Sequence, residues 1–475
     1  MRYDVIVIGA GVCGAMIARG LSGLKLKTAL LEKAPDVAMG ASKANSGIVH
    51  GGFDALPGTL KAELNVRGTA LMKDVCRDLD VPFKNCGSLV VAFSEEDKAT
   101  LEELAERGRK NGVPGVSIIG ADKLRELEPN VAPEAVGALF CESSGIVCPY
   151  ELTIGAAENA VKNGVDLKLG CKVTAIEATE DGFVVTTSTG AFECSYIVNA
   201  AGVYADEIAR MVGDDSFRII PRRGEYYLLD RTVGSLVSRT IFQCPNKMGK
   251  GVLVTPTVDG NLLVGPTSVD LTEGREDVST TLEGLDKVAR LGGRSVPKAS
   301  VRDAITSFAG VRAHPDSNDF IIGVSEANPR FINAAGIESP GLSAAPAIAE
   351  RVTEIVEELT GAQKNESFDP VREPVFRFRH ATDAERAEAI EKNPAYGRIV
   401  CRCESVTEGE IIDAIKAGAT DIDGVKRRTR AGMGRCQGGF CGSKVAELLA
   451  ELAGAELNTV TKFGGESKLL YERTK

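Results

Sequence analysis

The first 32 residues alternate between apolar runs and a glycine-rich turn. Val5–Ile8 and Thr28–Leu31 are short, unbroken apolar runs, and a stretch of helical length lies between them. Such runs are typical of strands that are buried on both faces. The pattern predicts a strand at 4–9, a helix at 14–24 and a strand at 28–32, which form a compact strand–helix–strand unit.

A second region of this kind follows Pro149. A helical pattern covers about 150–163, and strand-like runs follow at about 165–169, 173–178 and 196–200. An Asp181-Gly182 pair predicts a hairpin turn within this series. Residues 330–360 repeat the theme with a strand, a glycine turn and a long helix from about Pro346 to Thr360.

The stretch from 217 to 325 has a different character. Apolar and polar residues alternate there over short runs, with glycine and proline between them, which predicts an antiparallel sheet. We therefore expect residues 1–364 to fold as a discontinuous nucleotide-binding domain (about 1–85, 150–215 and 326–364) that carries an inserted substrate domain. The inserted domain would comprise about 86–149 and 216–325.

The C-terminal quarter reads as a separate module. Residues 365–395 are charged and interrupted by prolines, which predicts a linker with some helix at 384–391. Short helical patterns at 406–417, 421–428 and 443–453 predict a small helical domain over 396–455, followed by a tail at 456–475.

Composition limits the classes of function. A chain of 475 residues has room for two to four domains, and its net charge of −10 comes with both signs interspersed and no basic stripe. We therefore expect no nucleic-acid partner. The N-terminus lacks the features of a secretory signal, and no stretch reads as a transmembrane segment. We expect a cytoplasmic protein, with peripheral docking on a membrane partner left open.

Residues 9–14 carry a dinucleotide fingerprint. Gly9, Gly11 and Gly14 form a GxGxxG motif between the first strand and its helix, and Glu32 ends the second strand. The glycines permit a tight turn, close approach of a pyrophosphate and close packing of helix on strand, while Glu32 can accept hydrogen bonds from a ribose. The motif suits FAD or NAD, but its N-terminal position and the later segments favour FAD. A single fingerprint gives no support for a second dinucleotide.

Further segments resemble the D-amino acid oxidase-like FAD-dependent oxidoreductases, in particular those of the anaerobic glycerol-3-phosphate dehydrogenase type. The resemblance spans about 1–360 and rests on the fingerprint, Glu32-Lys33, 42–52, Asn199-Ala200-Ala201-Gly202 and 336–346. It implies an α/β fold, with a Rossmann-like FAD-binding domain and an inserted antiparallel sheet. It also implies that further residues bind FAD: Lys33, Ser42, Asn45, Ser46, Val173, Ala201, Gly202, Gly336, Gly341, Leu342 and Ser343.

The substrate site needs an anchor for charge and a base. Arg312 is the predicted anchor, because arginine grips a carboxylate or phosphate through two parallel hydrogen bonds. His50, in a glycine-flanked turn, and His314 are the candidate bases, although a structural role for His50 is an equal alternative. Arg223 and Tyr226 either line the substrate wall together or lie on alternate faces of one strand.

Four cysteines near the C-terminus form two close pairs. Cys401 and Cys403 are followed, 33 positions after Cys403, by Cys436 and Cys441. Four thiolates suit zinc or an iron–sulfur cluster, and structural zinc less often uses a Cys-X-Cys pair. Glycines beside Cys436 and Cys441 free backbone N–H groups to point at sulfur. The spacing resembles the bacterioferritin-associated ferredoxin-like [2Fe–2S] domain, which implies that these four residues hold a [2Fe–2S] cluster.

Together the two modules predict an electron relay. We expect a dehydrogenase that oxidises a small anionic alcohol, with sn-glycerol 3-phosphate as the substrate that the resemblance implies. Electrons would leave FAD through the cluster to a second flavoprotein or another electron-acceptor subunit. L-2-hydroxyglutarate or an amino acid remains an alternative substrate, and a non-catalytic electron-transfer subunit remains an alternative function.

Overall fold

The computed structural model describes residues 2–245 and 251–472, and it contains two compact units. The larger comprises Met1–Leu31 with Ala38–Arg372, and the smaller comprises Glu32–Val37 with Glu373–Lys475. None of the helices in the described ranges is both long and apolar enough to cross a membrane.

The first sheet of the larger unit is built from three distant stretches of chain. β1 (Arg2–Ile8) pairs in parallel with β2 (Thr28–Leu31) on one side and with β12 (Gly190–Asn199) on the other. The order is β10-β11-β12-β1-β2-β9, with β20 beside β12 and β19 beside β20. The remaining bounds are β9 (Asp166–Lys168), β10 (Val173–Thr179), β11 (Gly182–Thr187), β19 (Ile321–Val324) and β20 (Phe331–Ala335).

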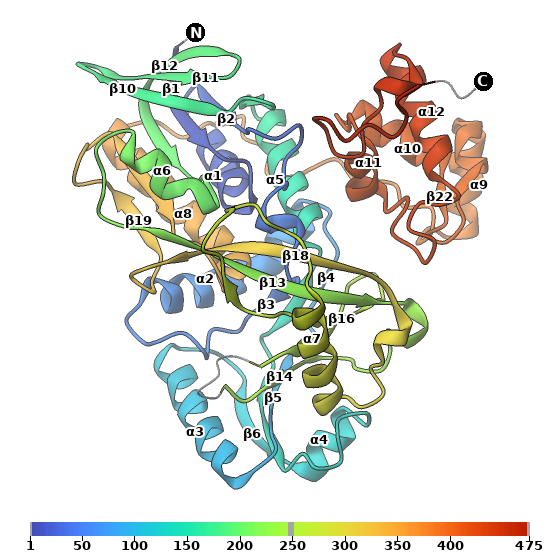
Figure 1. Ribbon diagram of the computed structural model, residues 1–475. Coiled ribbons are helices and arrows are strands. Elements are labelled where there is room, and N and C mark those ends of the chain that lie inside the picture. The colour runs from blue at the N-terminus through green and yellow to red at the C-terminus, as the bar shows by residue number, and fades with distance from the viewer. Residues whose placement is uncertain (1, 246–250, 473–475) are drawn as a thin grey trace. The chain divides into compact units, whose positions relative to one another are not determined.

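Helices of the same stretches pack beside this sheet. α1 (Val12–Ser22) packs against α5 (Pro149–Lys162) and α8 (Gly341–Thr360), and α2 (Leu60–Asp78) packs against α8 (Figure 1). The short α6 (Ala205–Arg210) follows β12. A core of buried apolar side chains includes Ile6, Phe183, Ile197 and Phe331. The parallel centre and its helices confirm the expected Rossmann-like α/β architecture.

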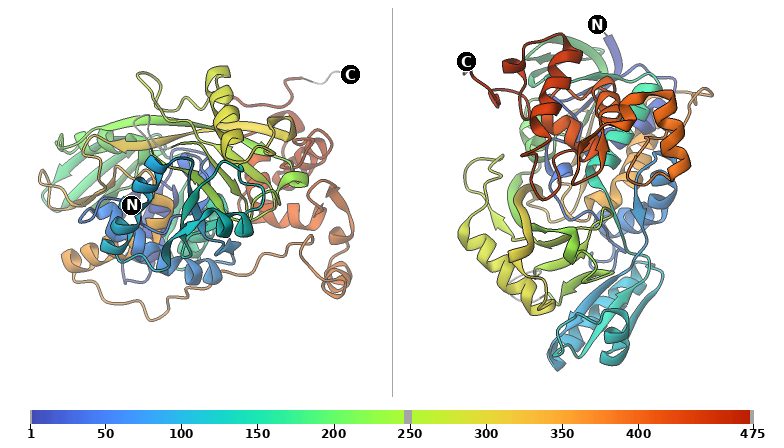
Figure 2. Two further views of the ribbon diagram at one scale, coloured as in Figure 1. Left: turned by 90° about the horizontal axis from the view of Figure 1, so that it is seen from below. Right: turned by 90° about the vertical axis from the view of Figure 1, so that its right-hand side faces the viewer.

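The second sheet is the inserted antiparallel layer. Its order is β17-β13-β16-β15-β14-β5-β7-β6, with the long β18 beside β13, and β14 pairs with β5 in parallel. Figure 2 shows the ribbon from two further sides. The bounds are β5 (Ser88–Ala92), β6 (Val116–Gly120), β7 (Gly137–Cys141), β13 (Ile219–Leu229), β14 (Thr240–Gln243), β15 (Leu253–Pro256), β16 (Leu262–Gly265), β17 (Val269–Asp270) and β18 (Ala304–Pro315). A small third sheet contains β3 (Ile48–Val49), β4 (Phe83–Lys84) and β8 (Gly145–Val147).

Two details differ from the sequence prediction. α7 (Leu282–Ser295) interrupts the stretch that was expected to form strands only, and α3 (Glu95–Lys110) and α4 (Ala121–Leu127) accompany β5–β7. α8 begins at Gly341 rather than Pro346, so the proline lies inside the helix. Proline is common in the first turn of a helix, whereas inside a helix it removes one backbone hydrogen bond. Packing of the buried face of α8 against α1 and α2 offsets that loss.

The smaller unit is mainly helical. Its elements are α9 (Asp383–Lys392), β21 (Ile399–Cys401), β22 (Val406–Thr407), α10 (Glu408–Lys416), α11 (Ile422–Thr429) and α12 (Gly442–Ala453). Reciprocal side-chain caps at Thr382 and Thr407 begin α9 and α10. Val460, from the stretch expected to be a tail, is buried in the core with residues of α10–α12. Residues 456–472 therefore include part of the core of this unit.

Candidate functional site

The glycine turn after β1 has the geometry that a dinucleotide requires. Gly9 has φ of +102°, and a Cβ there would lie 2.5 Å from the carbonyl oxygen of Ala200. A Cβ on Gly14 would lie 1.8 Å from the carbonyl oxygen of Gly9. Packing alone therefore demands glycine at the first and third positions.

The middle glycine of the turn is different. A Cβ on Gly11 would meet only the Oγ of Ser42, at 3.3 Å, so the space in front of this glycine is open. Gly11 is the N-cap of α1 and, as a glycine, supplies no side-chain acceptor. Ser42 accepts a hydrogen bond from Val12 N at 2.9 Å. An open backbone at a helix N-terminus fits the pyrophosphate of FAD.

A second helix N-terminus lies beside the loop that carries His50. Ser343, in the first turn of α8, is fully buried and accepts a hydrogen bond from His50 N at 2.8 Å. Asn65 and Thr69 of α2 donate to the carbonyl oxygen of His50. The loop position of His50 is thus fixed by α2 and α8. Gly341 and Leu342 begin the same helix, whose dipole would stabilise negative charge on a reduced flavin.

The other residues expected at the cofactor have varied surroundings. Asn45 bonds within its own loop, to Ala41, Ser42 and Gly47, so its side chain shapes the turn. Gly202 has φ of +58° with open space where a Cβ would be, whereas a Cβ on Gly336 would meet Pro315. These contacts leave the roles of Gly202 and Gly336 as predictions. The same holds for the remaining residues: Glu32, which accepts a hydrogen bond from Ala34 N; the exposed Lys33; Val173, at the start of β10; and Ala201, after β12.

Arg312 is held in place but retains an unused donor. Its Nη2 donates to the carbonyl oxygen of Thr267 at 2.7 Å. Its Nε is buried and has no hydrogen-bond partner among the described residues. A Cβ on Gly224 would lie 2.6 Å from Nη2, so glycine at that position makes room for the guanidinium. A buried donor without a partner is costly unless a ligand satisfies it, and an anion would.

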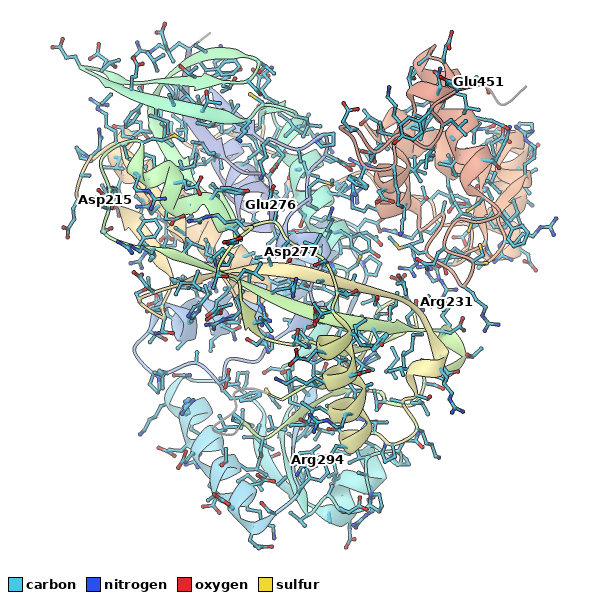
Figure 3. The ribbon with its side chains drawn as sticks, viewed as in Figure 1. Asp215, Arg231, Glu276, Asp277, Arg294 and Glu451 are labelled. Carbon is cyan, nitrogen blue, oxygen red and sulfur yellow. The ribbon has the colours of Figure 1, made fainter. Side chains whose placement is uncertain are left out.

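Tyr226 and Arg223 lie on opposite faces of β13, because side chains alternate along a strand. Tyr226 stacks on Phe308 at 4.8 Å, and its hydroxyl lies 3.3 Å from Ser46 Oγ, which connects it to the predicted flavin loop. Arg223 instead donates to Asp277 at 2.6 Å. Asp277 is labelled in Figure 3. The geometry thus favours the alternate-face interpretation, in which Tyr226 faces the site and Arg223 holds the loop after β17.

His314 has partners that the sequence did not reveal. Its Nδ1 lies 2.9 Å from Glu338 Oε1, and Lys61 Nζ lies 2.8 Å from the same oxygen. Ser339 Oγ lies 3.5 Å from Nε2 of His50, so both histidines contact one loop before α8. The residues of these contacts are 24 to 289 positions apart, and no local motif marks Lys61 or Glu338.

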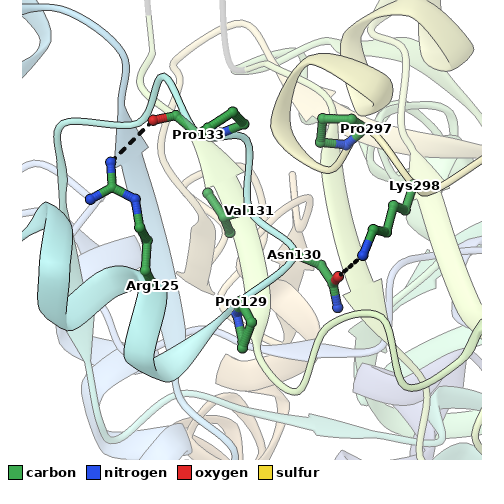
Figure 4. Close-up of a pocket in the computed structure, with 7 residues that line it drawn as sticks. All are labelled: Arg125, Pro129, Asn130, Val131, Pro133, Pro297 and Lys298. Atoms are coloured by element: carbon green, nitrogen blue, oxygen red, sulfur yellow. Dashed lines mark hydrogen bonds between the residues drawn. The ribbon is translucent and has the colours of Figure 1, made fainter.

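A separate pocket lies between α4 and the segment after α7. It is lined by Arg125, Pro129, Asn130, Val131, Pro133, Pro297 and Lys298 (Figure 4). Arg125 and Lys298 are bonded to Pro133 O and Asn130 Oδ1 across it. The pocket shares no residue with the groups described above, so it offers no support for the proposed chemistry.

The four C-terminal cysteines come together in the smaller unit. Cys403 Sγ and Cys436 Sγ are 3.8 Å apart. A hydrogen bond with Cys441, helped by backbone N–H groups of Gly432 and Glu404, lowers the pKa of the Cys401 thiol to about 6, although burial opposes this. Backbone N–H groups of Phe440 and Gly438 likewise lower the pKa of Cys436. N–H groups aimed at sulfur fit a thiolate-ligated [2Fe–2S] cluster.

Glu404 provides a first testable prediction, on stability. It is buried beside the cysteines and accepts from Arg379 at 3.2 Å and Arg430 at 2.8 Å. Removing one member of such a buried ionic group costs about 3–5 kcal/mol, because the partners stay charged. We expect the smaller unit of Glu404→Ala to unfold at a clearly lower denaturant concentration than that of the wild type. The visible absorbance of the cluster would monitor this unfolding transition. Glu451→Ala, an exposed change on α12 (Figure 3), should leave the transition unchanged.

Comparisons with known proteins agree with this geometry. Residues 4–355 match the family of FAD dependent oxidoreductases, and 399–451 match the BFD-like [2Fe-2S] binding domain. The chain is 48% identical over 476 residues to a glycerol 3-phosphate dehydrogenase of Caloramator mitchellensis (100% of this chain, 99% of the relative). It is 37% identical to a glycerol 3-phosphate oxidase of Mycoplasma genitalium (74% and 94%).

A solved structure shares the fold of the larger unit. It is the dithionite-reduced L-alpha-glycerophosphate oxidase from Mycoplasma pneumoniae with FAD bound, at a TM-score of 0.75 and 33% identity, covering 78% of this chain and 98% of that one. The predicted cofactors are therefore confirmed. The chain belongs to the FAD-dependent oxidoreductases and carries a C-terminal BFD-like [2Fe–2S] binding domain.

Proposed function

We propose that the chain oxidises sn-glycerol 3-phosphate to dihydroxyacetone phosphate and transfers the electrons to another protein. The observation that carries the proposal is Arg312, which lies two residues before His314 on one strand and whose buried Nε has no hydrogen-bond partner among the described residues. The relatives named for glycerol 3-phosphate, one of them along the whole chain, support the choice of substrate.

The residues of the chain have distinct tasks in this reaction. Arg312 binds the anionic group of the substrate through charge-assisted hydrogen bonds. One imidazole takes the proton of the substrate hydroxyl. Tyr226 and Ser46 join the wall of the inserted sheet to the flavin loop through their hydroxyls. When bound, FAD supplies a hydride acceptor, and the [2Fe–2S] cluster supplies a one-electron carrier.

A substrate panel tests this proposal directly. Under anaerobic conditions, glycerol 3-phosphate should bleach the flavin absorbance of the purified protein at a rate that saturates with concentration. L-2-hydroxyglutarate and amino acids should leave it oxidised, because their anionic group is a carboxylate on a different skeleton. Bleaching by hydroxyglutarate and not by glycerol 3-phosphate would reject the assignment, and no bleaching by any member of the panel would favour a non-catalytic electron-transfer subunit.

We further propose that the electron acceptor is a second flavoprotein or a quinone-linked subunit. Cys403 is exposed, and Phe440, next to Cys441, has 88% of its surface exposed. An exposed aromatic residue beside cluster ligands suits contact with a redox partner, because apolar side chains anchor protein interfaces.

The expected cytoplasmic location of the protein also stays a prediction.

A further inference from the structure

The hydrogen bonds of Glu338 determine which nitrogen of His314 carries a proton. The side chains of Glu338 and His314 are 13% and 9% exposed, and the carboxylate contacts both His314 Nδ1 and Lys61 Nζ. Burial alone would raise the pKa of Glu338, but Lys61 and His314 hold it below its usual value. The carboxylate is therefore ionised at neutral pH and accepts hydrogen bonds only.

An acceptor at Nδ1 has a consequence for the other side of the ring. His314 Nδ1 must carry the proton, so Nε2 of the neutral ring has a free lone pair. Within the described part of the chain, Nε2 has no hydrogen-bond partner. A carboxylate at one nitrogen with a free lone pair at the other is the arrangement of a general base with its orienting group.

His314 also lies where a base is needed. It follows Arg312 by two positions on β18, which places the two side chains about 7 Å apart on one face of the strand. That spacing allows a short substrate to be held by its anionic group while its hydroxyl reaches the imidazole. The charged groups near His314 are Glu338, Lys61 of α2, Arg222 of β13, Asp270 of β17 and Arg312.

We propose that His314 is the base that takes the hydroxyl proton, and that Glu338, anchored by Lys61, is its positioning residue. The inference rests on the proposed function. The hydroxyl O–H bond breaks and its proton moves to His314 Nε2, while the adjacent C–H bond breaks and a C=O bond forms. FAD, when bound, would supply the acceptor for the hydride that leaves the carbon. His50, whose backbone is held by α2 and α8, then serves as a wall of the site.

Rapid anaerobic mixing with substrate tests the proposal, because it separates substrate affinity from the limiting rate of flavin reduction. Glu338→Gln should lower the limiting rate by about 10²–10⁴-fold, as expected for a disabled base, with little change in substrate affinity. The matched control is Glu350→Gln, because Glu350 pairs with Arg67 between the same helices, α8 and α2, but on the exposed surface. It should behave like the wild type.

Three further variants keep the test decisive if Glu338→Gln fails to fold. In Lys61→Met the pKa of Glu338 should rise, because the carboxylate loses its cationic partner. The carboxylate then protonates at a higher pH. On acidification, the limiting rate of flavin reduction should therefore begin to fall at a higher pH than in the wild type. His314→Asn should lose the limiting rate more severely than His50→Asn. An unchanged pH profile in Lys61→Met, or a larger loss in His50→Asn, would overturn the proposal. A wild-type flavin left oxidised by glycerol 3-phosphate would instead reject the proposed function.

Discussion

Arg312→Ala should lower kcat/KM for glycerol 3-phosphate by about 10²–10³-fold, with most of the change in KM. Loss of one partner of a desolvated charge pair costs about 2–5 kcal/mol, and each 1.4 kcal/mol is a factor of ten. Arg312 Nε is buried without a hydrogen-bond partner among the described residues, and Gly224 leaves room for the guanidinium, which is what the proposed role in binding an anion requires. Steady-state kinetics with a dye acceptor would measure the effect.

Two further substitutions sharpen this prediction. Arg312→Lys keeps the charge but loses the planar fork, so it should recover only part of the lost affinity. Arg302→Ala, an exposed change just before β18, is the matched control and should leave both constants unchanged. If Arg312→Ala retained the wild-type KM, the substrate anchor would have to be assigned elsewhere.

Cys436→Ser should abolish the cluster and leave the flavin bound. Cys436 and Cys403 lie in contact, and each receives backbone hydrogen bonds in the smaller unit, whereas the glycine turn belongs to the larger one. Losing one thiolate from a four-cysteine site leaves iron with an incomplete ligand set. We expect iron content and cluster absorbance to fall to background, with one flavin per chain retained.

The same variant separates the two halves of the reaction. Under anaerobic conditions, the substrate should still bleach the flavin at the wild-type rate. Reduction of a physiological acceptor should stop if electrons leave the protein through the cluster. Cys86→Ser, in the larger unit, is the control and should retain the iron. Stoichiometric zinc in place of iron in the wild-type protein would contradict the assignment of the cluster.

The local motifs of this protein could be predicted because their physics is local. The turn at Gly9–Gly14 needs glycine for backbone reasons that hold in any such unit, and the predicted strand and helix on either side are confirmed. The four cysteines were identifiable by spacing alone, and the structure brings Cys403 and Cys436 together as expected. These motifs limited the cofactors to FAD or NAD and to zinc or an iron–sulfur cluster, and the family resemblance implied FAD and the [2Fe–2S] cluster.

Other features depended on contacts between distant residues. The start of α8 ahead of Pro346 depends on burial against α1 and α2. α7 lies in a stretch whose short apolar runs resemble strands, and it packs against β13 and β16. Neither feature has a local signal that outweighs the proline or the alternating pattern, so the sequence prediction started α8 too late and did not identify α7.

The sequence by itself determined the chemistry that this protein carries: a dinucleotide turn, four thiolates, and an arginine and a histidine two positions apart on one strand. Only the tertiary structure decided how these groups act together. It separated Tyr226 from Arg223 by strand alternation, and it brought Glu338 to His314 across 24 positions and Lys61 to Glu338 across 277. The physical reason is that hydrogen bonds and ion pairs require contact in space, which a linear pattern records only between close neighbours.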